Sequence, residues 1–318
     1  RKNYEGADYV FYLPADTPSN ARRFLDIVHP EIAIFIKYEF WINLLSELRR
    51  RKVRSYIVSA IFRRNSVFFR PYGAMWRQAL ETFDTLFVQN VESKRLLSEI
   101  GFDNVVVAGD TRFDRVAQIA AAAQRVETIE RFRGGGRLFV AGSTWGPDEE
   151  ILLPLVNANP DVKFVIAPHE MDEGRIAHLM RDAKGGAVRY TQCDAATRFD
   201  DVQVLVLDTM GMLSSVYGSA TWAYVGGGFG VGIHNTLEAA TFGLPIAFGP
   251  NYGKFKEARD MVSLGCAVSV RTAGELAAWF APLRDDEETL RRASRTAKDY
   301  TARNQGATGI ILRSIFNS

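Results

Sequence analysis

Short apolar runs alternate with amphipathic segments along the whole chain. Runs of this kind separated by helices predict a parallel sheet covered on both faces. In the first third, the predicted strands are residues 9–13, 32–37, 55–60, 85–89 and 105–108. The helices predicted between them are residues 17–28, 41–51, 66–82 and 91–100.

The same alternation restarts after residue 130. A helical segment ends in Gly134-Gly135-Gly136, which is the best linker candidate. A further set of strands is predicted at residues 138–141, 163–167, 187–191, 202–207, 222–225, 245–248 and 267–270. The fold class is therefore α/β, with two Rossmann-like domains facing a cleft, residues 1–125 and 126–318.

The two ends of the chain affect where these two domains begin and end. Residues 287–316 predict one or two helices broken near residues 304–306, and this terminal helix could cross back to the first domain. The first block opens almost directly on a strand, and residue 1 is Arg1 rather than Met. We therefore expect the first domain to lack its first strand-helix unit.

Composition narrows the class of protein. Hydrophobic residues make up 47% of the 318 residues and charged residues 24%, and the net charge is +2. This profile is typical of a soluble globular protein and predicts no nucleic-acid partner. Two cysteines exclude a disulfide framework, and no apolar run of about 18 residues is present.

One local charge cluster stands out. Arg49, Arg50, Arg51, Lys52 and Arg54 lie together, and Arg63 and Arg64 follow soon after. Such a cluster is either a solvated helix end or a docking face for an anionic surface such as lipid headgroups.

The strongest site signal is a glycine-rich stretch at residues 226–238. A predicted buried strand runs into five glycines within seven positions, with Gly227 and Gly228 among them, and then into a helix. Glycine allows positive φ and close approach to a ligand, and a helix start suits a phosphate. Glu238 lies about one turn from Asn235 and could accept hydrogen bonds from ribose hydroxyls. The alternative is a tight turn without a ligand.

Other nucleotide motifs do not fit this stretch. The third glycine of a dinucleotide fingerprint would fall on Val231 or Ile233, and no acid follows about 20 residues later. A P-loop is excluded because no Gly-Lys-Ser/Thr occurs. The pattern therefore favours a sugar-nucleotide donor.

Three other predicted strand ends carry polar or glycine residues. Ligands of open parallel sheets bind beyond the carboxyl ends of the strands, so these ends point to one pocket. They are Gly142-Ser143-Thr144, Pro168-His169-Glu170 and Asp208-Thr209-Met210-Gly211-Met212.

The first block contributes two candidate residues. Glu39 follows a strand next to aromatic residues, which suits sugar binding or proton handling, or it caps a helix start. Arg112 could meet an anionic donor or acceptor across the cleft, or pair with Asp110 or Asp114. No Ser-His-Asp arrangement, zinc spacing or Asp-x-Asp pair stands out, so neither a metal nor another cofactor is expected.

Many of these residues resemble the motifs of the 3-deoxy-D-manno-octulosonic acid (Kdo) transferases. In the first block the matching segments are Tyr12-Leu13-Pro14, Asp16, Arg23-Phe24-Leu25, Glu39-Phe40-Trp41, Asn43, Gln89-Asn90, Gly109-Asp110 and Phe113-Asp114. In the second they are Asp208-Thr209-Met210-Gly211, Tyr217-Gly218, Val225-Gly226-Gly227, residues 234–240, Phe248-Gly249-Pro250 and Phe255-Lys256.

This resemblance implies a GT-B fold and an inverting transfer of Kdo from CMP-Kdo to a lipid A precursor. It implies peripheral contact with the anionic cytoplasmic face of the bacterial inner membrane. Glu39 would support catalysis, with the main base in a segment before residue 1, so we expect this chain alone to be inactive. The implied CMP contacts are Pro168, His169, Met210, Gly211, Met212, Asn235, Thr236, Leu237 and Glu238; the glycine loop and strand ends add Ser143, Thr144, Gly227, Gly228 and His234.

The chain departs from the family pattern at five positions. Lys37 replaces the first acid of the Glu-Thr-Glu-Leu-Trp-Pro motif, and Met212 replaces the acid of Met-Gly-Glu. The other departures are Ile42, Pro168 and Thr236. The alternatives are another GT-B enzyme, such as a UDP-sugar transferase or epimerase, and a nucleotide-binding module without catalysis.

Overall fold

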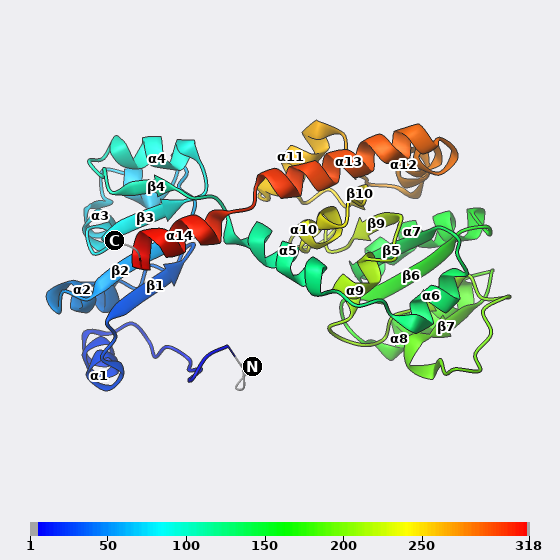
Figure 1. Cartoon of the computed structure of the whole chain (residues 1–318), viewed down its shortest axis with the longest axis horizontal. Coiled ribbons are helices and arrows are strands. Elements are labelled where there is room, and N and C mark those ends of the chain that lie inside the picture. The colour runs from blue at the N-terminus through cyan, green and yellow to red at the C-terminus, as the bar shows by residue number, and fades with distance from the viewer. Residues whose placement is uncertain (1–5, 317–318) are drawn as a thin grey trace. The chain divides into compact units, whose positions relative to one another are not determined.

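The computed structural model describes residues 6–316 and contains two parallel sheets flanked by helices (Figure 1). Its contacts divide the chain into two compact units. The first comprises the described residues up to Thr111 together with those from Gly306 onward, and the second is Arg112–Gln305. The predicted α/β class of two Rossmann-like domains is confirmed.

The first unit is built on a four-stranded sheet of order β1-β2-β3-β4. Its strands are β1 (Ile32–Ile36), β2 (Arg54–Ala60), β3 (Thr85–Val88) and β4 (Val105–Val107). Its helices are α1 (Pro18–Val28), α2 (Ile42–Arg50), the 3-10 helix η1 (Val67–Phe69), α3 (Ala74–Leu80), α4 (Val91–Ser98) and α14 (Ala307–Phe316).

The C-terminal helix α14 packs on this first sheet. Ile311 and Ile315 share a buried cluster with Tyr56 and Phe87, and the Arg54 guanidinium donates to the carbonyl of Ile315 at 2.7 Å. The end of the chain therefore completes the unit in which the chain begins.

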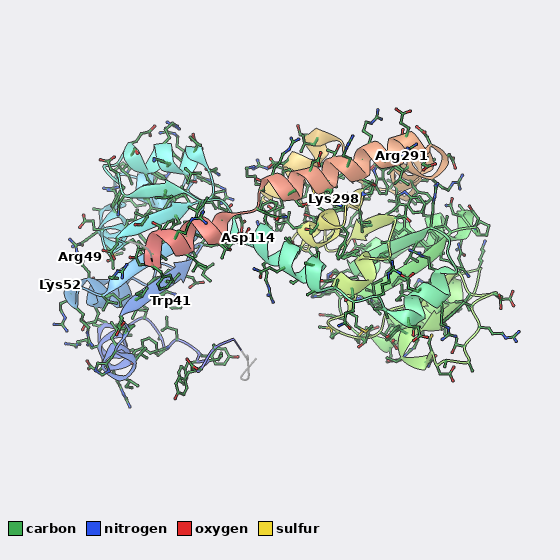
Figure 2. The ribbon with its side chains drawn as sticks, viewed as in Figure 1. Trp41, Arg49, Lys52, Asp114, Arg291 and Lys298 are labelled. Atoms are coloured by element: carbon green, nitrogen blue, oxygen red, sulfur yellow. The ribbon has the colours of Figure 1, made fainter. Side chains whose placement is uncertain are left out.

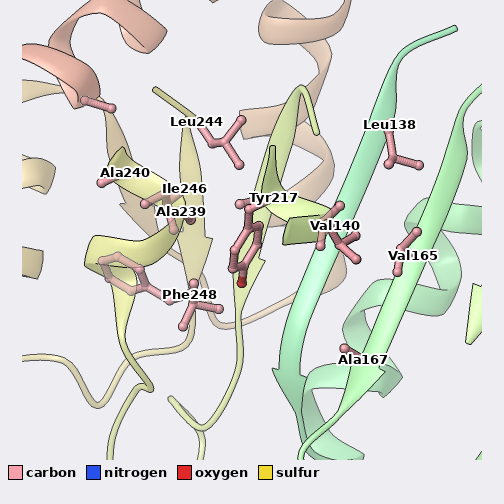
Figure 3. Packing of buried hydrophobic residues seen from close by; sticks show 14 of the residues in the cluster. Leu138, Val140, Val165, Ala167, Tyr217, Ala239, Ala240, Leu244, Ile246 and Phe248 are labelled. Atoms are coloured by element: carbon pink, nitrogen blue, oxygen red, sulfur yellow. The ribbon is translucent and has the colours of Figure 1, made fainter. Parts of the chain in front are cut away.

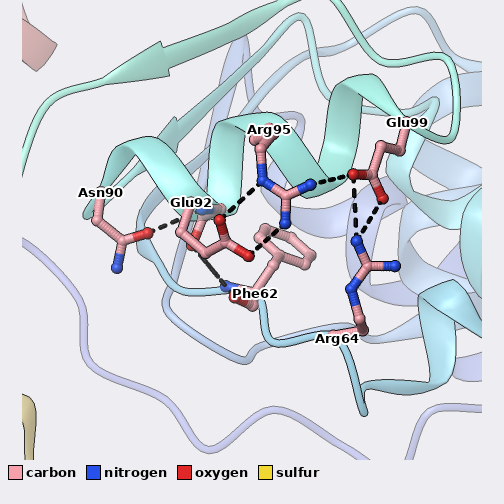
Figure 4. Close-up of polar contacts among 7 residues, drawn as sticks. Phe62, Arg64, Asn90, Glu92, Arg95 and Glu99 are labelled. Carbon is pink, nitrogen blue, oxygen red and sulfur yellow. Dashed lines mark hydrogen bonds and ion pairs between the residues drawn. The ribbon is translucent and has the colours of Figure 1, made fainter.

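Local hydrogen bonds explain why α4 begins where it does. The Asn90 side chain accepts from the backbone N–H of Ser93 at 2.8 Å, which satisfies one of the free N–H groups at the helix start (Figure 4). Arg95 then pairs with Glu92 and Glu99 on the same helix, at spacings of three and four residues.

The second unit is built on a seven-stranded sheet of order β11-β10-β9-β5-β6-β8-β7. Its strands are β5 (Leu138–Thr144), β6 (Lys163–Pro168), β7 (Ala187–Arg189), β8 (Val204–Val206), β9 (Trp222–Val225), β10 (Ile246–Phe248) and β11 (Ala267–Ser269). Its helices are α5 (Thr111–Ala122), α6 (Glu127–Arg133), α7 (Gly146–Ala158), α8 (Glu173–Asp182), η2 (Tyr190–Gln192), α9 (Leu213–Tyr217), α10 (Thr236–Thr241), α11 (Lys256–Leu264), α12 (Ala273–Asp285) and α13 (Glu287–Arg303).

Alternate strand residues of this sheet bury opposite faces. Val140 and Val165 lie in one core cluster with Tyr217 and Phe248 (Figure 3), whereas the intervening Phe139 lies in the other. Both faces are apolar because helices cover both, which explains the continuous hydrophobic runs in the sequence.

Two of the predicted elements are wrong. Residues 9–13 form no strand, and the side chains of Tyr9 and Tyr12 are exposed. Residues 66–82 are two short helices, η1 and α3, separated at Pro71 and Gly73. Proline has no backbone N–H to continue a helix, and a Cβ on Gly73 would lie 2.1 Å from the carbonyl oxygen of Val67.

The boundary between the units also lies elsewhere than residue 125. Phe113 and Val116 of α5 are buried with Leu237 and packed against Tyr300, so α5 belongs to the second unit. Gly134 only ends α6 in a left-handed conformation.

The strand order of the second sheet reverses at β5. From β5 the sheet extends through β6, β8 and β7 on one side and through β9, β10 and β11 on the other. The carboxyl ends of β5 and β9 therefore form the switch point at which open parallel sheets bind ligands.

Candidate functional site

Three loops meet at the switch point. The backbone N–H of Gly226 donates to Gly142 at 2.9 Å, and that of His169 donates to Thr144 at 2.9 Å. The N–H of His234 donates to Gly226 at 3.0 Å, which folds the glycine-rich loop back on its own start. The predicted strand ends after β5, β6 and β9 are thus one cluster.

Packing within the chain explains most glycines of the loop. A Cβ on Gly226 would lie 2.2 Å from the carbonyl oxygen of Ser143, and one on Gly228 would lie 2.6 Å from the backbone of Gly249. Gly227 has φ +90° and faces the His234 ring. Only ordinary contact is found at Gly230. The number of glycines reflects close backbone approach inside the protein, and by itself it does not indicate a phosphate.

Asp148 ties this loop to α7. Its carboxylate is fully buried and accepts from the Tyr224 hydroxyl at 2.7 Å, from Gly227 N–H at 2.9 Å and from Trp145 N–H at 2.9 Å. Burial, together with this neighbouring carboxylate, raises the pKa of Tyr224. Asp148 therefore organises the loop and offers no free carboxylate to a ligand.

The turn after β5 is strained. Ser143 has φ +55°, a conformation that L-residues rarely adopt, and the pairing of β5 with β6 shifts register beside it. The buried hydroxyl of Thr144 donates to Glu149, which also pairs with Arg175 at 2.5 Å. Strain of this kind often accompanies functional sites.

Two histidines and a tryptophan stack across the loops. The His169 and His234 rings lie 4.3 Å apart between centroids, and the His169 and Trp145 rings lie 4.8 Å apart. The indole N–H of Trp145 donates to Nε2 of His234 at 3.1 Å. Burial and then the nearby His169 lower the pKa of His234.

Glu238 is fixed by two side chains. The Ser214 hydroxyl donates to one carboxylate oxygen at 2.9 Å, and the Asn235 amide donates to the other at 3.0 Å. The side-chain oxygen of Asn235 caps α10 by accepting from the backbone N–H of Leu237. Asn235 and Glu238 are therefore together, as predicted.

The side chains of Thr236 and Leu237, between Asn235 and Glu238, point into the protein interior. The side chain of Leu237 is buried against Phe113 and Val116, and that of Thr236 is also buried. Neither side chain is therefore open to a ligand in this structure.

The loop after β8 is open. Met210 is 77% exposed, and Gly211 has φ +87° with no heavy atom within 4 Å of its Cβ position. Met212 is half-buried against the core, and Pro168, at the end of β6, is buried. Asp208 is held by Thr191, whose hydroxyl donates to it at 2.6 Å.

In the first unit, Glu39 lies beside an apolar groove. The Trp41 indole N–H donates to Glu39 at 2.6 Å (Trp41 is labelled in Figure 2). The groove has a volume of about 750 Å³ and is lined by Glu39, Lys37 and apolar side chains that include Phe24, Val28 and Ile36. Glu39 is thus an exposed carboxylate at an apolar surface.

Arg112 belongs to the second unit, where it pairs with the buried Glu257 at 2.7 Å. The pairing anchors the guanidinium within the second unit.

Most arginines of this cluster form ion pairs with acidic side chains. Arg49 pairs with Glu81, Arg50 with Glu47, and Arg51 with Glu47 and Asp26. Arg64 pairs with Glu99 (Figure 4). Among the residues that the structure describes, no group of three or more His, Cys, Asp or Glu side chains could hold a metal ion.

Sequence reasoning missed Trp145 and Ser214. Each contacts a predicted site residue, His234 or Glu238, from a different element. Trp145 directly follows the predicted strand end at Ser143-Thr144, and that position was the available signal.

A family model described as 3-deoxy-D-manno-octulosonic-acid transferase (kdotransferase) matches residues 1–115. The chain is 27% identical over 314 residues to 3-deoxy-D-manno-octulosonic acid transferase of Bordetella pertussis, covering 96% of this chain and 73% of the relative. The Haemophilus influenzae enzyme of the same name is 24% identical over 96% of this chain and 73% of its own length.

Solved structures agree on the architecture. UDP-GlcNAc 2-epimerase from Neisseria meningitidis, bound to UDP-GlcNAc, superposes with a TM-score of 0.65 at 15% identity, over 95% of this chain and 80% of the epimerase. The likeness extends over both units and shows the fold. The chain is thus similar to Kdo transferases over nearly its whole length, and its fold is of the two-domain α/β GT-B type.

Proposed function

We propose that this protein is a glycosyltransferase that moves Kdo from CMP-Kdo to a lipid A precursor in lipopolysaccharide biosynthesis, with inversion at the anomeric carbon. The observation that carries the proposal is the similarity to Kdo transferases over 96% of the chain. The cluster of strand ends at the switch point of the second sheet supports it, because this is where the fold binds nucleotides.

The second unit binds the CMP moiety in this proposal. Glu238, held by Ser214 and Asn235, accepts from the ribose hydroxyls, since a fixed carboxylate is a strong acceptor. The open loop at Gly211 leaves room for the base. The proposed contact residues are Ser143, Thr144, Pro168, His169, Met210, Gly211, Met212, Gly227, Gly228, His234, Asn235, Thr236, Leu237 and Glu238.

The chemistry is a single displacement. The acceptor hydroxyl oxygen attacks the anomeric carbon of Kdo, and the bond from that carbon to the phosphate oxygen breaks. CMP leaves with the bonding electrons, and the hydroxyl proton passes to a general base. The ring N–H groups of the stacked His169 and His234 stabilise the negative charge on the leaving phosphate.

The first unit takes the acceptor. Glu39 supports the reaction from the edge of the apolar groove, where Phe24, Val28 and Ile36 suit a lipid and Lys37 suits its phosphate. We include Arg112 as a contact to the anionic donor or acceptor; its pairing with Glu257 holds the guanidinium in place.

The lipid acceptor implies a membrane surface, and we propose peripheral contact at the cytoplasmic face of the inner membrane. Within residues 6–316, every helix is too short or too polar to traverse a bilayer. Exposed apolar side chains support surface contact, among them Phe11, Tyr12, Ile27 and Ile36. Sedimentation with anionic and with zwitterionic vesicles tests this membrane contact, and we expect more protein to pellet with the anionic vesicles. Equal amounts of protein in the two supernatants would reject the contact.

Calorimetry with CMP and with UDP tests the donor assignment. We expect CMP to bind at least tenfold more tightly. Preference for UDP would favour another GT-B nucleotide-sugar enzyme, and binding of neither would reject the site. A transfer assay with CMP-Kdo and lipid IVA, run on the chain alone and on the chain fused to the N-terminal segment of the Bordetella pertussis relative, then separates an enzyme from a binding module.

A further inference from the structure

Trp145 is held by contacts from three directions. Its backbone N–H donates to Asp148 at 2.9 Å, and the Arg175 guanidinium lies over its ring at 5.9 Å from the centroid. Its ring also stacks near His169. A side chain restrained in this way can fix the orientation of whatever it bonds.

The partner that it bonds is His234. An indole N–H is a donor only, so Nε2 of His234 must accept at the observed 3.1 Å. An imidazole whose Nε2 accepts carries its proton on Nδ1 when the ring is neutral. The tautomer of His234 therefore follows from the identity of residue 145.

We propose that Trp145 is a positioning residue that locks His234 in the neutral tautomer with the proton on Nδ1. The ring then keeps one N–H as a hydrogen-bond donor for a nucleotide phosphate. This inference rests on the proposed function, because it assigns the phosphate of the donor to the same site.

The groups that surround the ring come from four elements and do not all act in the same direction. His169 stacks on it from the end of β6, and Asp148 lies on α7. Arg175 of α8 covers Trp145, and Lys254 bonds the carbonyl of Val231 in the glycine-rich loop. Protonation of His234 would place a second N–H against the indole N–H and would abolish the hydrogen bond. Burial and His169 lower the pKa of His234 and outweigh the nearby Asp148, which raises it, in agreement with a neutral ring.

Nitrogen-15 NMR of the histidine side chains tests the tautomer directly. The protein has only four histidines, His29, His169, His178 and His234, so a His234→Gln variant assigns the signal. In the unmodified protein, we expect His234 to have a protonated Nδ1 and an unprotonated Nε2. A signal with the proton on Nε2 would overturn the proposal, and this result needs no tryptophan variant.

Trp145→Phe keeps an aromatic ring but removes the N–H. We expect a mixed tautomer, a rise in the pKa of His234, and a CMP affinity about fivefold lower, the effect of one lost hydrogen bond. Trp279→Phe, a half-buried tryptophan of α12 packed against the core, is the matched control and should change none of the three. An unchanged tautomer and pKa in Trp145→Phe would refute the positioning role, even if CMP binding fell.

The two proposals fail separately. If the unmodified protein binds no CMP, the proposed function fails, while the NMR measurement still decides whether Trp145 sets the tautomer. If CMP binds but His234 carries its proton on Nε2, only the positioning role of Trp145 is rejected.

Discussion

The backbone N–H of Gly227 donates to a carboxylate oxygen of Asp148 at 2.9 Å. This bond joins the glycine-rich loop after β9 to the first turn of α7, 79 residues earlier in the chain. The same carboxylate accepts from Trp145 and Tyr224, and it is fully buried. One side chain therefore satisfies three donors, and two of these hydrogen bonds are fully buried.

Asp148→Ala should destabilise the second unit strongly. Three donors would lose their acceptor, two of them in buried hydrogen bonds, and each unsatisfied buried group costs about 1–3 kcal/mol. We expect a loss of at least ~3 kcal/mol in the free energy of unfolding, measured by urea denaturation, together with weaker CMP binding.

Two variants serve as controls for Asp148. Tyr224→Phe removes one of the three hydrogen bonds and should cost about 1 kcal/mol. Glu150→Ala removes an exposed acid of the same helix and should change stability by less than ~0.5 kcal/mol. If Asp148→Ala proved as stable as Glu150→Ala, the organising role of Asp148 would be wrong.

Two glycines of the loop should respond differently to alanine. A Cβ at residue 228 would lie 2.6 Å from the backbone of Gly249, so Gly228→Ala should cost about 1–3 kcal/mol through overpacking. At Gly230 the nearest atom is 3.6 Å away, and Gly230→Ala should stay within ~0.5 kcal/mol. Thermal unfolding of both variants measures the contrast, and equal effects would contradict the packing explanation.

The sheets were predictable because their strands are continuous apolar runs. The predicted strand at residues 222–225 has the bounds of β9, and every residue in it is buried. The strand predicted at residues 9–13 fails because a strand also needs a hydrogen-bonded neighbour, which the sequence of one segment does not specify.

The positions of the site residues were predictable, but their contacts were not. His169 and His234 follow strands that end at one edge of a parallel sheet, so their proximity was expected. The hydrogen bond from Trp145 to His234 spans 89 residues and depends on how two loops fold. The glycines were assigned to a ligand because a sequence does not reveal that Ser143 and Gly249 fill the space where a Cβ would lie.

Acid should weaken the first unit through Glu47. Hydrogen bonds from Arg50, and less strongly from Arg51, lower the pKa of this carboxyl group from 4.5 to about 2. Because the pKa is lower in the folded state, the stabilisation is present above pH 4.5 and is lost as the pH falls towards 2. Glu47→Gln should cost about 1 kcal/mol at pH 7 and should flatten the pH dependence in this window.

Urea unfolding at several pH values between 2 and 7 measures the effect of Glu47. Glu31→Gln, which alters an exposed acid of the same unit just before β1, provides a comparison for general acid denaturation. Parallel stability curves for the unmodified protein and Glu47→Gln would exclude Glu47 as a source of the pH dependence.

Glu238→Ala should weaken CMP binding by about 1–3 kcal/mol in calorimetry, the scale of a lost charged hydrogen bond. The unfolding free energy should change little by comparison, since Glu238 is only half-buried. Ser214→Ala leaves the carboxylate in place but removes one of the two groups that orient it, so its effect should be smaller, about 1 kcal/mol. Unchanged CMP affinity in Glu238→Ala would remove this residue from the ribose contact, and an equal loss for UDP would show that the contact does not distinguish the base.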